Sequence, residues 1–95
     1  MAVIQSFRCE ETKKIWEGKT SRRFPQDIQR TVLRKLIQLN AAGTLEDMRV
    51  PPGNRLEALK GRLAGFHSIR VNDQWRIIFK WSDAGPADVA LVDYH

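Results

Sequence analysis

Hydrophobic and polar residues alternate in some parts of this sequence and recur at helical spacing in others. Residues 3–7 alternate as a short β-strand does. Residues 9–18 are rich in helix formers, with Ile15 and Trp16 expected to face inward and Gly18 expected to end the helix. The chain is therefore predicted to begin with a strand followed by a helix.

The clearest helical pattern begins at Pro25, a residue suited to the first position of a helix. Asp27 falls in the first turn, where the helix dipole favours a negative charge, and residues 41–43 end the pattern. We expect the apolar positions to form one stripe that packs into the core. These positions are Ile28, Val32, Leu33, Leu36, Ile37 and Leu39.

After a loop at residues 44–54, rich in turn-forming residues, the pattern changes to the two-residue period of strands. Tight turns are expected at residues 72–74 and 83–86. The predicted strands are residues 55–59, 66–72, 75–81 and 88–95. The expected fold is a single α+β domain over residues 1–95, with two N-terminal helices packed on a mainly antiparallel twisted sheet in the order β-α-α-β-β-β-β.

The side chains of the two central predicted strands divide between two faces. On the first strand, Ile69 and Val71 point one way and Arg70 points the other. On the second, the odd-numbered residues are apolar, whereas Arg76 and Lys80 have the opposite parity. If the apolar sets face the helices, these three basic residues emerge together on the open face of the sheet. By the same rule, the histidine at position 67 faces the apolar side, as a partly buried and hydrogen-bonded residue.

The composition is that of an ordinary folded protein, since 42% of the 95 residues are hydrophobic and 28% are charged. The single cysteine, Cys9, is expected to pack in the interior, and it has no partner for an internal disulfide, which favours a reducing cytoplasm. The sequence contains no apolar run of about eighteen residues and no signal peptide at its N-terminus. We therefore expect a cytoplasmic protein with no membrane partner.

The formal net charge is +5, from 16 lysines and arginines against 11 aspartates and glutamates. Basic residues gather between positions 55 and 80, where a sheet face carrying several guanidinium groups would suit phosphates and favours RNA as partner. The alternative is a solvated face with scattered ion pairs. The expected RNA-binding residues of this segment are Arg55, Arg62, Arg70 and Lys80, beside Lys60 and Arg76.

The sequence contains neither a metal-ligand set nor a common catalytic motif. Its two histidines and one cysteine lack the spacing of a zinc site, and it has no glycine-rich phosphate loop and no Gly-x-Ser-x-Gly elbow. We therefore expect no cofactor and no bound metal.

Asp93, Tyr94 and His95 carry the remaining candidate chemistry. In RNA the 2′-hydroxyl can attack the neighbouring phosphate, so the protein needs to supply only a base, an acid and a cation. His95 or Tyr94 would transfer protons, while Arg76 and Lys60 would neutralise the charge that develops on the phosphate. The other interpretation is an ordinary strand end that packs on its neighbour. Alternation also places Asp93 and His95 on one face and Tyr94 on the other.

Four segments of the sequence resemble HigB-type toxins of the RelE-like (RelE/ParE) superfamily. They are IQSF at 4–7, PPGNRLEALKG at 51–61, HSIRVNDQWRI at 67–77 and VDYH at 92–95, and the third is the most specific. The resemblance implies a RelE-like microdomain that cleaves mRNA on the ribosome without a metal ion and is neutralised by a HigA-type antitoxin. It also implies functional roles for Lys60, Arg76, Asp93, Tyr94 and His95.

Two positions depart from the family pattern. Glu57 stands where some members have a histidine, which leaves the identity of the general base open, because an ionised carboxylate accepts protons but repels phosphate. Arg62 stands where an acidic residue is frequent. The residues themselves also leave two other functions open: a non-catalytic RNA- or ribosome-binding inhibitor of translation, and a protein-interaction subunit whose basic surfaces meet an acidic antitoxin.

Overall fold

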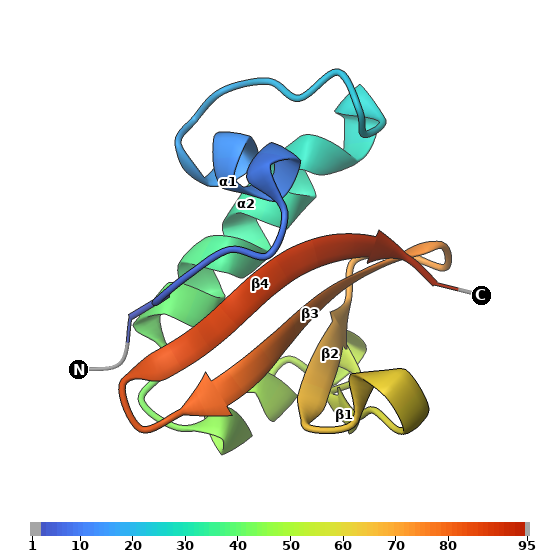
Figure 1. The fold of residues 1–95 in the computed structure, drawn as a ribbon. Helices are drawn as coiled ribbons and strands as arrows, with labels where there is room; N and C mark the ends of the chain where they lie inside the picture. The colour runs from blue at the N-terminus through green and yellow to red at the C-terminus, as the bar shows by residue number, and fades with distance from the viewer. Residues whose placement is uncertain (1–2, 95) are drawn as a thin grey trace.

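Two helices cover one face of a four-stranded antiparallel sheet in the computed structural model, which describes residues 3–94 (Figure 1). The helices are α1 (Glu10–Trp16) and α2 (Gln26–Ala41). The strands lie side by side in chain order: β1 (Glu57–Ala58), β2 (Phe66–Arg70), β3 (Trp75–Ser82) and β4 (Gly85–Asp93). The predicted α+β class and the meander of four strands are confirmed. None of the helices in the described part is long and apolar enough to cross a membrane.

The apolar stripe of α2 enters the core, as predicted. Pro25 caps the helix instead of being its first residue. Ile37, which the prediction included in the stripe, is 54% exposed, because it follows the buried Leu36 by one position and so lies about 100° around the helix. The core residues of α2 are Ile28, Val32, Leu36 and Leu39, packed in one cluster with Ile69, Ile77 and Phe79 of the sheet.

The N-terminal segment is not the strand that its alternation predicted. Residues 3–8 run beside β4 (Figure 1), but only Phe7 and Val89 form a bridge, and that bridge is parallel. The register between β3 and β4 shifts at a bulge in which Asp88 has a φ of 51°. The backbone N–H of Asp88 donates to Ser6 Oγ (2.9 Å), not to a backbone carbonyl. Because the bulge interrupts the ladder, the segment follows β4 without becoming a fifth strand.

The loops and turns that the sequence predicted determine where the strands end. Asn72 Oδ1 accepts hydrogen bonds from the backbone N–H groups of Gln74 and Trp75 (2.8 Å each), so β2 stops at Arg70 and the expected turn at residues 72–74 forms. The loop at residues 44–54 contains two 3-10 helices, and a third precedes β2. They are Leu45–Arg49, Pro52–Asn54 and Gly61–Leu63.

A buried asparagine holds this long connection against α2. Asn54 has no exposed surface, and its Nδ2 donates to the backbone carbonyl of Met48 (3.1 Å), while Lys35 Nζ of α2 donates to its Oδ1. Arg55 follows in the left-handed conformation, with a φ of 46°. The predicted strand over residues 55–59 therefore shrinks to the two residues of β1, since the chain enters it from a non-extended residue.

The hairpin between β3 and β4 is tighter than predicted. β4 begins at Gly85 instead of Asp88, and Ser82 Oγ donates to the Gly85 carbonyl (2.6 Å). Gly85 has a φ of 132°, and a Cβ atom at this position would overlap the backbone of Val3. A glycine is therefore required both by the turn and by the close approach of the N-terminal segment.

We expect Gly85→Ala to lower the free energy of unfolding by more than about 1 kcal/mol, because the backbone of two segments would have to move. Gly53→Ala provides the matched control, since a Cβ atom there meets nothing within 4 Å, and it should stay within about 0.5 kcal/mol of the wild type. Urea denaturation measures both. Equal stabilities for the two variants would contradict the close approach.

Candidate active site on the open face of the sheet

The face of the sheet that the helices leave open carries a second, smaller apolar cluster of Phe66, Ile78 and Ala90. Basic residues extend along it. Arg70 of β2 is the register partner of Arg76 of β3, and Lys80 is the partner of Phe66. Register partners share a face, so the predicted emergence of Arg70, Arg76 and Lys80 on the open face is confirmed.

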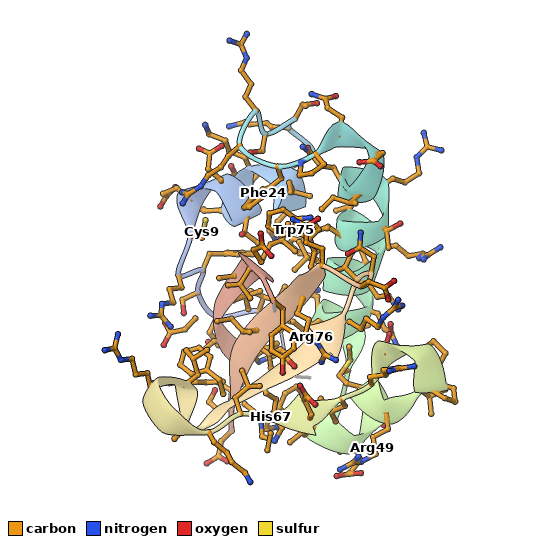
Figure 2. All side chains as sticks on the ribbon, turned by 90° about the vertical axis from the view of Figure 1, so that its right-hand side faces the viewer. Cys9, Phe24, Arg49, His67, Trp75 and Arg76 are labelled. Atoms are coloured by element: carbon orange, nitrogen blue, oxygen red, sulfur yellow. The ribbon has the colours of Figure 1, made fainter. Side chains whose placement is uncertain are left out.

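Arg76 occupies the centre of this face and is only 8% exposed (Figure 2). Its Nη1 donates to Ser68 Oγ (2.8 Å) and to the backbone carbonyl of Arg55 (3.3 Å). The same nitrogen lies 3.4 Å from Glu57 Oε1, and the guanidinium carbon lies 4.7 Å from the centroid of the Tyr94 ring. Arg76 is therefore a positive charge held in a fixed orientation, with arginine's planar group suited to paired contacts with a phosphate.

Glu57 and Tyr94 come from opposite edges of the sheet and meet over Arg76. The hydroxyl of Tyr94 donates to Glu57 Oε1 at 2.9 Å, and the backbone N–H of Tyr94 donates to the Gln74 carbonyl at 2.6 Å. Tyr94 is 38% exposed. We call Glu57, Ser68, Arg76 and Tyr94 the Arg76 cluster; it unites a carboxylate, a hydroxyl, a guanidinium and a phenol, one from each strand or its end.

The contact with Glu57 changes the acidity of Tyr94. Its pKa is raised, first because the hydroxyl donates a hydrogen bond to the Glu57 carboxylate and then because that carboxylate is negative, while Arg76 opposes the shift. Tyr94 therefore stays protonated to a higher pH than an isolated tyrosine.

Replacing the acceptor should reverse this shift. We expect Glu57→Gln to lower the pKa of Tyr94, because the negative charge that opposes phenolate formation is removed while Arg76 remains. The chain contains one tyrosine, so its ultraviolet absorbance change on ionisation reports this residue alone. Asp83→Asn, at the distant hairpin turn, should leave the titration unchanged. An unaltered pKa in Glu57→Gln would refute the contact.

The other predicted catalytic residues have different positions. Asp93 is the register partner of Trp75, whose ring packs against Phe24 on the helix side, and it accepts a hydrogen bond from Gln74 Nε2 (3.1 Å). Lys60 follows β1 with an exposed side chain, and within residues 3–94 it forms no ion pair. His95 lies outside the described residues. The structure thus brings together Arg76 and Tyr94 of the predicted set.

Of the four predicted RNA-binding residues, Arg70 and Lys80 share the open face with Arg76, and Arg55 contacts Arg76. Arg55 is exposed, and its carbonyl holds Arg76, whereas Arg62 is exposed on the 3-10 helix before β2. Arg70 forms an ion pair with Asp73. Lys80 Nζ lies 5.1 Å from the centroid of the Phe66 ring and 4.0 Å from an Asp88 carboxylate oxygen. The RNA-binding roles of all four residues stay predictions.

His67 and Cys9 lie outside the cluster. The ring of His67 stacks on Phe79 at 6.3 Å, which confirms its position on the helix side, but its buried Nδ1 has no hydrogen-bond partner within residues 3–94, so the predicted hydrogen bonding is wrong at this atom. Cys9 packs against both apolar clusters. In the described part of the chain, no three histidine, cysteine or carboxylate side chains lie close enough together to hold a metal ion.

Two members of the Arg76 cluster were not among the predicted catalytic residues. Glu57 drew attention only as a departure from a family pattern, and Ser68 only shares its parity with Arg70. Arg8, whose guanidinium carbon lies 5.4 Å from the Phe66 ring centroid, was missed altogether. The parity rule could have suggested Ser68, but the approach of Arg8 depends on how the N-terminal segment crosses the sheet.

This fold is known from solved toxin structures. YoeB from Staphylococcus aureus, in its complex with YefM, superposes with a TM-score of 0.60 and 19% identity over 100% of this chain and 98% of that chain. YafQ from Escherichia coli strain BL21(DE3) gives a TM-score of 0.60 and 16% identity over 98% and 93%. The chain therefore has the RelE-like toxin fold.

The sequence places the chain more narrowly within this class. Residues 5–95 match the family described as "RelE-like toxin of type II toxin-antitoxin system HigB". Toxin HigB-1 of Vibrio cholerae serotype O1 is 49% identical over 78 residues, which are 82% of this chain and 78% of the relative. This chain belongs to the HigB-like toxins. It is the toxin of a type II toxin–antitoxin system, and its partner is an antitoxin.

Proposed function

We propose that residues 1–95 act as one toxin domain that cleaves mRNA on the translating ribosome in the cytoplasm. The cleavage requires no metal ion, and a HigA-type antitoxin neutralises it. The observation that carries this proposal is the Arg76 cluster, in which a nearly buried guanidinium contacts both a carboxylate and a tyrosine on a basic sheet face. Family membership supports an RNA substrate, and this cluster supplies groups for its chemistry.

In the proposed reaction, the 2′-hydroxyl oxygen of one nucleotide attacks its own 3′-phosphorus, and the bond to the 5′-oxygen of the next nucleotide breaks. A base removes the 2′-proton, and an acid returns a proton to the leaving 5′-oxygen. Glu57 is the carboxylate that can accept the first proton, because its ion pair with Arg76 offsets its repulsion of phosphate. Tyr94 or His95 supplies the second. The products are a cyclic phosphate and a 5′-hydroxyl.

Arg76 stabilises the negative charge that develops on the phosphate in the transition state. Its contacts with Ser68 and the Arg55 carbonyl hold the guanidinium in place before substrate binds, so no reorganisation is needed during the reaction. Lys60, exposed two residues after β1, adds positive charge. Arg55, Arg62, Arg70 and Lys80 then position the RNA backbone.

The decisive test is primer extension on a defined message in a reconstituted translation system, with and without ribosomes. Wild-type protein should generate new 5′ ends only with ribosomes and equally well in the presence of a metal chelator that spares ribosome integrity. Removal of His95 should lower the rate by at least ~10²-fold, the usual scale for a lost proton-transfer group.

Two other results would redirect the interpretation. Inhibited translation with intact message, unchanged by removal of His95, would indicate an RNA- or ribosome-binding inhibitor without catalysis. No inhibition, combined with tight binding of an acidic antitoxin, would indicate a protein-interaction subunit. Full cleavage by the variant lacking His95 would support the enzymatic function but would show that His95 is not a catalytic residue.

A further inference from the structure

A groove of about 620 Å³ lies on the open face next to the Arg76 cluster, and the predicted catalysis does not use it. Its floor is apolar, formed by Leu63, Ile78, Ala90 and Val92, and its rim carries Arg8 and Arg23. This volume lies within the range of about 300–1,000 Å³ that is usual for small-molecule sites. We propose that this groove binds one unpaired base of the RNA, from a nucleotide close to the cleaved bond; this inference rests on the function proposed above.

Its position relative to Arg76 supports this assignment. Val92 in the floor is the register partner of Arg76, so the two side chains are neighbours on the same face. Ile78 lies two residues beyond Arg76 on β3, a step of roughly 7 Å at the usual strand rise. An RNA strand whose phosphate contacts Arg76 therefore reaches the groove with an adjacent nucleotide.

The chemistry of the groove suits a base more than a bare phosphate. Unpaired bases bind through their flat apolar faces, on aliphatic or arginine surfaces, and through the polar atoms along their edges. The apolar floor of the groove provides the aliphatic surface. Arg8 provides a guanidinium plane, which its contact with Phe66 keeps close to the floor, because Phe66 belongs to the same apolar cluster as Ile78 and Ala90.

Two carboxylates at the rim oppose simple attraction of phosphate. Glu11 is neutralised by Lys14 Nζ at 2.9 Å and accepts a hydrogen bond from Ser21 Oγ at 2.7 Å. Glu10 also lines the groove and provides an acceptor for the N–H groups of a base edge. With Glu11 paired to Lys14, Glu10 offsets only part of the charge of Arg8 and Arg23, and the apolar floor then selects for a base over a bare phosphate.

The single cysteine offers a direct readout, because Cys9 lines the groove and lies at the start of α1 (Figure 2). Burial disfavours its thiolate, but hydrogen bonds from Thr12 and from the Glu11 backbone, with the charge of Arg23, bring its pKa below the usual value. Alkylation by iodoacetamide should therefore proceed at mildly alkaline pH, and an occupied groove should slow it.

The experiment measures the alkylation rate of the full chain with and without a short single-stranded oligonucleotide. Methoxy groups at the 2′ positions prevent cleavage during the measurement. We expect strong protection of Cys9 by this oligonucleotide and none by an abasic oligonucleotide of equal length and charge. Each rate is compared with that of the same variant without ligand, because substitutions near Cys9 also change its intrinsic reactivity.

Two neighbouring arginines provide a matched pair. Arg23 lines the groove, whereas Arg22 is exposed and does not. Arg23→Ala should raise the oligonucleotide concentration for half-protection by about tenfold, the effect of losing one charged contact, and Arg22→Ala should leave it unchanged. Circular dichroism shows whether each variant is folded.

The outcomes separate this inference from the proposed enzymatic function. Cleavage in the translation system without protection of Cys9 by the oligonucleotide would overturn the base site and leave the nuclease intact. Equal protection by the abasic oligonucleotide would also overturn it. Protection that depends on bases and on Arg23, even in a preparation without nuclease activity, would support the base site.

Discussion

Arg76→Ala should reduce the rate of message cleavage by at least ~10²-fold, the usual loss when a group that stabilises developing charge is removed. The structure gives the reason. The guanidinium contacts Ser68, Glu57 and the Tyr94 ring, so its removal also leaves the Glu57 carboxylate without its counter-charge. Single-turnover cleavage on programmed ribosomes measures the effect on chemistry separately from product release.

Because Arg76 is nearly buried, its removal also affects the fold, and controls must separate the two effects. Arg76→Lys keeps the charge but loses arginine's planar set of donors, and it should recover only part of the rate. Ser68→Ala removes one of the contacts that orient Arg76 without changing any charge. Its cleavage rate should fall much less than that of Arg76→Ala. If Arg76→Ala is folded and cleaves at the wild-type rate, the proposed site is wrong.

Phe79→Ala should lower the free energy of unfolding by about 3–5 kcal/mol, a large part of the stability of a domain of this size. Phe79 of β3 has no exposed surface, belongs to the core cluster that includes α2, and stacks on its cross-strand neighbour His67. The substitution removes its packing contacts and leaves a cavity in the core. Urea denaturation followed by tryptophan fluorescence measures the loss.

Two further substitutions, one milder and one on the surface, serve as controls for this prediction. Phe79→Leu keeps most of the volume and should cost less than the alanine variant. Ile37→Ala removes an aliphatic side chain of α2 that is 54% exposed, and it should stay within about 0.5 kcal/mol of the wild type. A cost at Ile37 equal to that at Phe79 would show that the outer face of α2 is covered in solution.

The proposed chemistry joins residues that the sequence keeps far apart. Glu57 and Tyr94 are 37 positions apart, and they meet because the meander returns β4 to the side of β3 while Arg76 bridges toward β1. The groove also joins distant parts of the sequence, because Arg8 precedes α1, Arg23 lies in the loop between α1 and α2, and Val92 belongs to β4. If both assignments hold, one continuous surface carries the cleavage chemistry and a neighbouring base site.

The sequence by itself determined the features that depend on local backbone geometry. The period of α2 specified its buried stripe, and the two-residue alternation of β2 and β3 placed Arg70, Arg76 and Lys80 on the open face, because side-chain direction follows directly from backbone geometry. A family resemblance in the segments at 51–61 and 67–77 then indicated the class of toxin, which the family match confirms.

Only the tertiary structure decided which distant residues contact one another. Local alternation predicted an N-terminal strand, but the bulge at Asp88 and its bond to Ser6 interrupt the ladder that would have formed it. Alternation separated Tyr94 from Asp93 correctly, yet it could not show that the Tyr94 hydroxyl reaches Glu57. That contact depends on strand register and sheet twist, which arise when the whole chain packs, and no single segment encodes them.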